Sequence, residues 1–379
     1  MTDPTRPTPS SNHWSRFGAW RDQRLARLSA LGGWLADTAL DTSLWQEALG
    51  ELERRLQHDQ AQLAFVAELS RGKSELINAL FFGASGQRVL PAGAGRTTMC
   101  PLEISSEPGR PSTLRLLPIE TRAESRLLSD WKSRPQEWQE HGFAADDAVA
   151  MSRALQHLCD TVQVPLARAR ELGLHLPEGD EDERRDPDEQ VEIPRWRHAL
   201  LTIEHPLLAQ GISVLDTPGL NALGAEPELT LSLIPSAAAV VFLLSADAGV
   251  TRSDLQLWNE HIGAAGRERS FIVLNKIDML WDPLRSAAEV QAQIRKQCES
   301  VAQVLQVPLS RVFPLSAHKG LLARIHGDET LLQRSGLPQL EAALGECADR
   351  ERRDWLEGSW RATLLDTRQR LERDVDARV

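Results

Sequence analysis

The apolar positions of this 379-residue chain fall into short continuous runs separated by helical stripes. A short, continuous apolar run is typical of a buried strand, and apolar residues three and four apart are typical of one face of a helix. Strand-like runs occur at residues 63–67, 102–105, 199–203, 211–216, 238–244, 271–275 and 312–315, with a weaker one at 114–118. Helical spacing follows the first run, at Leu76, Ile77, Leu80 and Phe81. We therefore expect an α/β core over residues 61–335.

Helical patterns also lie on both sides of this core. Residues 1–15 are polar and rich in proline, and we expect them to be disordered. Residues 16–60 predict two helices with a break near 37–41, which form either an arm that packs on another helix or a plain helical layer on the core. Residues 336–379 carry an interrupted apolar stripe with many charges between. Such a helix is not expected to stand alone in water, so we expect it to pack on the N-terminal arm.

Residues 119–195 do not fit a minimal nucleotide-binding core, and we interpret them as an insertion. Part of it looks helical, with apolar residues at Ala154, Leu155, Leu158, Val162 and Leu166. Residues 178–190 hold eight acidic and two basic residues, which supply over half of the net charge of −11. This charge run is either a disordered loop or a binding tail, and its composition favours the loop.

Composition excludes several classes of protein. The net charge of −11 argues against a general nucleic-acid binder, so no nucleic-acid partner is expected. The four cysteines are far apart and predict neither a disulfide framework nor a zinc site, which fits a reduced, cytoplasmic location. No signal peptide opens the chain, and the longest apolar run, residues 237–244, is too short to span a bilayer. Any membrane contact would be peripheral or made by a segment outside this chain.

The first strand-like run ends in a sequence typical of a phosphate-binding loop. In such a loop the chain leaves a buried strand, its backbone N–H groups surround anionic oxygens, and a helix N-terminus follows. Lys73 would reach the outer phosphates and Ser74 would bind Mg²⁺, with further phosphate contacts from Ser70, Arg71, Gly72 and Glu75. The usual first glycine is replaced by Ala67, and the tripeptide alone also fits an ordinary strand–turn–helix.

Two later segments have the chemistry of nucleotide switches. A glycine-rich loop leads to Thr97 and Thr98, and a threonine in such a loop can close on Mg²⁺ and the γ-phosphate. The run at 211–216 ends in Asp216, followed by Gly219. This places a carboxylate at the end of a strand, where it can hold Mg²⁺ through water, and a glycine N–H near the γ-phosphate.

The runs at 271–275 and 312–315 end in residues that can recognise guanine. Asp278 can accept hydrogen bonds from N1 and N2 of guanine, which adenine does not offer. Asn275 can reach O6 and N7, and the stem of Lys276 can lie over the base. A backbone N–H of Ser316 or Ala317 can contact O6. Because such a site would leave polar groups unpaired against adenine, these motifs in this order predict binding of GTP and GDP.

These motifs resemble the GTPase domain of bacterial dynamin-like proteins over about residues 60–340. The stretches that carry the resemblance are AELSRGKSELINAL, AGAGRTTMCPLEI, DTPGLNALGAEPELTLSLIPSA and VLNKID. The resemblance implies a P-loop GTPase fold of the dynamin type, with a mixed, mostly parallel sheet flanked by helices. It also implies nucleotide-dependent pairing of two copies through their GTPase domains, and remodelling of membrane lipid from the inner face of the cell membrane. Thr98, or less readily Thr97, would be the switch threonine.

Two departures from the family pattern concern hydrolysis. Leu69 stands where eukaryotic dynamins have a glutamine that helps to place water, and Leu220 stands where Ras-like proteins have one. We therefore expect slow intrinsic hydrolysis. Arg71 and Arg96 are candidates to stabilise transition-state charge, although each is equally well explained as a solvated loop residue.

Two hypotheses follow for the chain as a whole. The first is an enzyme that hydrolyses GTP and couples domain pairing to movement of a helical arm. The second is a regulatory switch that binds a protein partner in the presence of GTP, with little turnover and no membrane role. Family members usually carry a longer helical stalk and a membrane-binding tip, so the chain is either a fragment or has a membrane role only by analogy.

Overall fold

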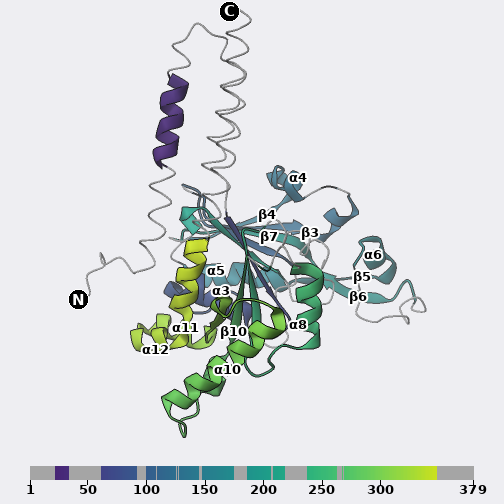
Figure 1. Ribbon diagram of the computed structural model, residues 1–379. Helices are drawn as coiled ribbons and strands as arrows, with labels where there is room; N and C mark the ends of the chain where they lie inside the picture. Colours follow the sequence, from purple (N-terminus) through teal and green to yellow (C-terminus); the bar gives the residue numbers. More distant parts are fainter. Residues whose placement is uncertain are drawn as a thin grey trace, which may run out of the picture. The chain divides into compact units, whose positions relative to one another are not determined.

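The computed structural model describes residues 22–33, 61–91, 100–107, 109–124, 126, 128–144, 147–174, 186–205, 208–217, 237–262, 267 and 269–347. The chain divides into two compact units, one of residues 62–209 and 213–341 and one of residues 1–61, 210–212 and 342–379. In the smaller unit, residues 22–33 form a helix, drawn in purple in Figure 1, in which Leu28 is buried. The expected disordered N-terminus, the rest of the N-terminal arm and residues 348–379 lie outside the described residues.

The larger unit is built on one long sheet. The order of its strands is β11-β10-β9-β1-β8-β2-β7-β3-β4, and a separate pair, β5-β6, forms a second small sheet. The strands are β1 Ala61–Ala67, β2 Leu102–Ser105, β3 Thr113–Pro118, β4 Gln139–Gly142, β5 Thr161–Pro165, β6 Gln190–Pro194, β7 Trp196–Thr202, β8 Ile212–Asp216, β9 Ala239–Ser245, β10 Ser270–Asn275 and β11 Val312–Pro314. Every strand-like run of the sequence overlaps one of these strands, and the runs in β1, β8, β9 and β10 are buried on both faces.

Strand direction divides the sheet into two parts. Strands β1, β9, β10 and β11 are parallel, with Phe65 beside Val241 and Ile272 beside Phe242. Strand β2 runs parallel to β7 but antiparallel to β8, and β3 is antiparallel to both of its neighbours. The carboxyl ends of β1, β9 and β10 therefore meet at one edge, which is where a ligand site is expected in a parallel α/β sheet.

Helices complete the unit. They are α3 Lys73–Phe81, α4 Leu128–Lys132, α5 Ala148–Gln156, α6 Leu166–Glu171, α8 Arg252–Leu257, α10 Ala287–Leu305, α11 Ala317–His326 and α12 Glu329–Ser335. A further helix covers residues 337–347, of which 337–341 belong to this unit. Short helical turns lie at Gly83–Ser85, Ile119–Ala123, Pro135–Glu137, His157–Cys159, Leu208–Gln210, Trp258–Ile262, Ile277–Leu280 and Leu309–Arg311. Among the described residues, no helix has both the length and the apolar character needed to cross a membrane.

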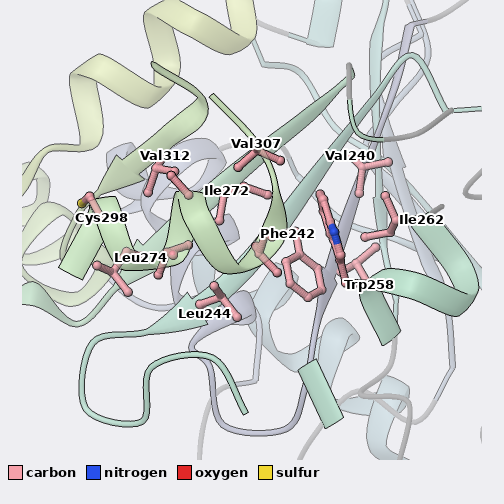
Figure 2. Close-up of a cluster of buried hydrophobic side chains, with 14 of the residues drawn as sticks. Val240, Phe242, Leu244, Trp258, Ile262, Ile272, Leu274, Cys298, Val307 and Val312 are labelled. Atoms are coloured by element: carbon pink, nitrogen blue, oxygen red, sulfur yellow. The ribbon is translucent and has the colours of Figure 1, made fainter. Parts of the chain in front are cut away.

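The two faces of β1 carry different layers. Ala64 and Val66 belong to the cluster of Figure 2, in which side chains of β9 and β10 pack against Trp258 and against Cys298 of α10. Phe65 points to the opposite face, where its ring meets Phe81 of α3 edge-on. Because neighbouring strand residues point to opposite faces, this pattern places β1 between two helical layers. On the Phe65 face α3 packs against α11 (Figure 1).

The region 119–195, which was expected to be partly helical, contains strands as well as helices. Helix α5 ends at Gln156, and Val162 lies in strand β5, so the interpretation of Val162 as part of a helix is wrong. The cause is local: polar and apolar residues alternate over 161–165, three of these residues are β-branched, and Pro165 pushes Val164 out of the helical region. Strands β5 and β6 pack with α6 around a small core of their own, and β4 joins the edge of the main sheet. Most of the acidic run, residues 178–185, lies outside the described residues.

Candidate nucleotide-binding site

The loop of residues 68–72, here called the phosphate loop, joins the end of β1 to the start of α3. Two of its residues adopt left-handed backbone angles, Ser70 at φ 65° and Gly72 at φ 91°. Gly72 is the N-cap of α3 and has no side chain with which to cap the N–H groups of the first turn. These N–H groups carry the positive end of the helix dipole, so the helix end has the chemistry of an anion site.

Lys73 and Asp216 form a buried ion pair at the start of α3. The Lys73 ammonium donates to Oδ1 of Asp216, the last residue of β8, whose side chain is 1% exposed. Burial raises the pKa of Asp216 above its ordinary value, and Lys73 opposes this shift. The pair brings together two residues 143 positions apart that the sequence assigned to the phosphates and to Mg²⁺.

The same pair provides a test of whether Mg²⁺ fits here. The second oxygen of Asp216, Oδ2, is buried and accepts no hydrogen bond from the described residues. This carboxylate oxygen and the hydroxyl of Ser74, in the first turn of α3, are both oxygen donors of the kind that suits Mg²⁺, which binds one or two protein oxygens together with substrate phosphates. The residues present therefore fit the ion. Next to Asp216, the Thr217 hydroxyl donates to the Phe65 carbonyl at 2.8 Å, which fixes β8 against β1.

Arg71 does not point into the site. Its guanidinium binds Asp254 of α8, with Nη2 to Oδ2 at 2.8 Å, and also reaches the hydroxyls of Ser245 and Thr251, each at 3.2 Å. In this structure the Arg71 guanidinium is therefore not a solvated loop charge, because it is bonded to the start of α8 and the end of β9. A Thr-x-x-Asp capping box at the start of a helix is a recognisable sequence signal, but nothing in it indicates which cation the aspartate binds.

Asn275 joins the phosphate loop to the loop after β11. Its Nδ2 donates to the carbonyl of Arg71 at 2.9 Å, and its Oδ1 accepts from the N–H of Ala317 at 3.0 Å. A Cβ added at Gly72 would lie 2.4 Å from this Nδ2. Glycine is therefore required here both by its backbone angle and by the close approach of Asn275.

The Ser316–Ala317 pair does not offer the N–H groups that the sequence suggested for guanine O6. The N–H of Ser316 donates to the Ser335 carbonyl at 2.8 Å, and that of Ala317 is taken by Asn275. The hydroxyl of Ser316 instead caps α11 by accepting from the N–H of Lys319. In this structure both donors hold the loops together, and direct contact of this pair with the base stays a prediction.

Lys276 and Asp278 follow β10 at the edge of the same site. Lys276 adopts φ 64°, and its ammonium lies 3.3 Å from Asp247 in the loop after β9. Asp278 lies in the turn Ile277–Leu280 and is partly exposed. The left-handed backbone at Lys276 turns the chain sharply after the strand, so both side chains leave the sheet at its carboxyl edge.

Glu75 binds protein rather than facing the loop. Its carboxylate receives Nε and Nη2 of Arg88 at 2.8 and 2.6 Å, and it lies 3.0 Å from Nδ1 of His318. Burial raises the pKa of Glu75, but the bonds from Arg88 and His318 outweigh this and lower it overall. These contacts tie α3 to α11. Leu69, in contrast, has no polar group to offer and is 51% exposed. Thr97, Thr98, Gly219, Leu220 and Arg96 lie outside the described residues.

The sequence pattern of the Dynamin family matches residues 63–277, which is more than half of the chain and includes the phosphate loop, Asp216 and Asn275. The chain belongs to the dynamin family. A bacterial dynamin-like protein of Nostoc punctiforme is 23% identical over 312 residues, which are 79% of this chain and 38% of that protein. Rat mitofusin-2 is 23% identical over 295 residues, 75% of this chain and 31% of that protein. This dynamin-family chain thus spans less than half the length of these curated relatives.

Solved structures show the same fold. Two structures of an oligomerised bacterial dynamin pair, described as a mechanism for the long-range sensing and tethering of membranes, match with TM-scores of 0.52 and 0.51. Each is 16% identical and covers 99% of this chain, which spans 50% and 59% of the respective structures. The predicted fold class, a dynamin-type domain with a mixed, mostly parallel sheet flanked by helices, is confirmed.

Proposed function

We propose that this dynamin-family chain binds GTP and GDP with Mg²⁺ at the carboxyl edge of β1, β8 and β10 and hydrolyses GTP. The observation that carries the proposal is the meeting of three motifs at one edge: the phosphate loop, the Lys73–Asp216 pair and the Asn275–Asp278 segment. Each motif alone has an ordinary structural explanation. Their convergence from positions about 200 residues apart in sequence supports a nucleotide that contacts all three.

Each residue then has a defined role in the proposal. The N–H groups of residues 70–74 bind the phosphates, and Lys73 exchanges Asp216 for the β- and γ-phosphates. Asp278 accepts from guanine N1 and N2. Asn275 keeps a second Nδ2 hydrogen that no described residue accepts, which can donate to the base. Glu75 and Ser316 act indirectly, because their contacts hold α3 and α11 in place. Thr98 and Gly219 would sense the γ-phosphate.

The proposal assigns two residues to the binding of Mg²⁺. Ser74 and Asp216 would bind Mg²⁺ together with the phosphates, and Mg²⁺ when bound neutralises the charge that develops on the transferred phosphoryl group. The chain contributes a fixed position for the carboxylate, because Asp216 is the last residue of a buried strand.

Pairing of two GTPase domains and membrane remodelling extend the proposal. They are supported by the family membership and by the likeness to structures described as an oligomerised pair that tethers membranes. A second function, a GTP-dependent switch that binds a protein partner, is favoured by one specific observation. Leu69 of the phosphate loop is an exposed apolar side chain, and it has no polar group that could help to place water.

Turnover measured against protein concentration distinguishes the two functions. We expect the GTPase rate per molecule to rise over a hundredfold range of concentration, because pairing can supply groups in trans that are worth about 10³–10⁵ in related GTPases. The measurement is phosphate release, combined with light scattering in GDP and in a non-hydrolysable GTP analogue and with co-sedimentation on anionic vesicles. A flat rate, monomers in both nucleotides and no lipid binding would exclude the pairing mechanism and leave the switch.

A further inference from the structure

We propose that Arg71 is a positioning residue, which holds the phosphate loop onto helix α8 through Asp254 and does not contact the nucleotide. The kinetic consequences of this inference rest on the proposed function. Its geometric consequences can be tested without any nucleotide.

The guanidinium of Arg71 is fully engaged by α8 and the strand before it. Nε and Nη2 donate to the two oxygens of Asp254 at 3.3 and 2.8 Å, Nη2 also reaches Thr251, and Nη1 reaches Ser245. The Arg71 side chain is only 12% exposed. A planar guanidinium that meets a carboxylate with two of its nitrogens is fixed in orientation as well as in position. All three nitrogens are therefore bonded to the start of α8 or to the end of β9.

Asp254 is also bonded to Thr251, the N-cap residue of its own helix. Its carboxylate is 0% exposed, and its Oδ2 accepts from the N–H and the hydroxyl of Thr251 at 2.9 and 2.7 Å. The bond from the Thr251 N–H is half of the capping box of α8, and the other half is the bond from the Asp254 N–H to the Thr251 hydroxyl. A buried carboxylate needs a cation, because an unpaired charge in the interior is strongly unfavourable. Releasing Arg71 toward a phosphate would leave Asp254 without its ion pair. The bonds between Arg71 and Asp254, here called the clamp, are thus expected to persist when a nucleotide binds.

The clamp acts on the strained part of the loop. Arg71 lies between Ser70 and Gly72, both with left-handed backbone, and a non-glycine residue such as Ser70 stays in that conformation only where its surroundings enforce it. The carbonyl of Arg71 is held separately by Nδ2 of Asn275. The residue is therefore fixed at its side chain and at its backbone. We infer that these two ties fix the loop N–H groups in the orientation that phosphate binding needs.

A double-mutant cycle separates positioning from direct action on the nucleotide. The variants are Arg71→Met, Asp254→Asn and the double variant, with Arg71→Lys as the conservative change and Arg168→Met as the matched control. Arg168 pairs with Glu171 on the exposed surface of α6. The readouts are dissociation of a fluorescent GDP analogue, kcat and KM for GTP, and hydrogen exchange of residues 63–76 in the nucleotide-free protein.

For positioning we expect both single variants to speed nucleotide dissociation by a similar factor, on the order of tenfold. The double variant should be no worse than either single variant, because the clamp is already lost. KM should rise more than kcat falls, since the loop binds the phosphates before and during reaction. Hydrogen exchange of residues 63–76 should increase in each variant. Arg71→Lys, which keeps the charge but not the fork, should lie between wild type and Arg71→Met.

Direct action gives the opposite pattern. Arg71→Met would then lower kcat with KM unchanged, and Asp254→Asn, by freeing the guanidinium, would leave kcat at or above wild type. That result, with hydrogen exchange unchanged, would overturn the inference. If Asp254→Asn alone fails to fold, the neutral double variant and Arg71→Lys still decide the question. Absence of GTP binding in wild type would remove the proposed function, yet hydrogen exchange would still report the clamp.

Discussion

Lys73→Ala is expected to abolish measurable GTP binding. Lys73 is the residue whose ammonium lies at the start of α3, beside the helix end that would receive the phosphates. Removing one member of a buried charge interaction with a ligand costs roughly 2–5 kcal/mol, which corresponds to a loss of affinity of about 30-fold to several thousandfold. Titration calorimetry with GTP and Mg²⁺ measures the loss. Lys296→Ala, at an exposed position of α10, is the matched control. Wild-type affinity in Lys73→Ala would refute the assignment of the phosphate site.

The Lys73→Ala variant should also become less stable as pH rises. Burial already raises the pKa of Asp216, and removal of Lys73, which lowers that pKa, raises it further. A carboxyl whose folded pKa lies above its unfolded value stabilises the protein at low pH and loses that contribution as pH increases through the folded pKa. An uncompensated buried charge costs about 3–5 kcal/mol. Thermal melting from pH 5.5 to 8 should show the deficit growing with pH, and Lys73→Ala/Asp216→Asn should remove this trend.

Asp278→Asn is expected to change base preference from GTP toward XTP. Asparagine can still accept a hydrogen bond from N1 of the base, but its amide NH₂ is a donor where aspartate had an acceptor. The C2 carbonyl of xanthine can accept from this donor, whereas the C2 amino group of guanine cannot. A site built for particular hydrogen-bond partners rejects a mismatch strongly, by about 10⁴-fold at the upper end. Asp278 is partly exposed, so the protein should fold normally. Competition between GTP and XTP measures the change, with Asp282→Asn as the neighbouring control. Unchanged selectivity for GTP over XTP would contradict guanine recognition by Asp278.

The core and the motifs could be predicted because their signals are local. The run before the phosphate loop is apolar throughout, so β1 is buried on both faces, and Lys73 directly follows the glycine at which α3 begins. A buried strand and a helix start of this kind depend on consecutive residues, so they can be predicted from a short stretch of sequence. Val162 shows the limit of periodicity over a short stretch, because its spacing from Leu158 and Leu166 fits a helix while Pro165 enforces a strand.

Contacts between distant residues were not predictable in the same way. Arg71 and Asp254 are 183 residues apart, and the sequence around either residue does not indicate that the other is its partner. The sequence therefore left Arg71 open between a transition-state group and a solvated charge. Likewise, the sequence could place Ala317 beside the base. It could not show that the Ala317 N–H donates to Asn275, because this contact depends on the register of β10 and β11. Tertiary packing decides which donor pairs with which acceptor when several are available.

The most direct test of GTP recognition is titration calorimetry of the wild-type chain with GTP and with ATP, both in the presence of Mg²⁺. If Asp278 and Asn275 recognise guanine beside the phosphate loop, GTP should bind at one site per chain, and ATP should bind at least about 10²-fold more weakly. Equal affinities for the two nucleotides, or no binding of GTP, would contradict the proposed site.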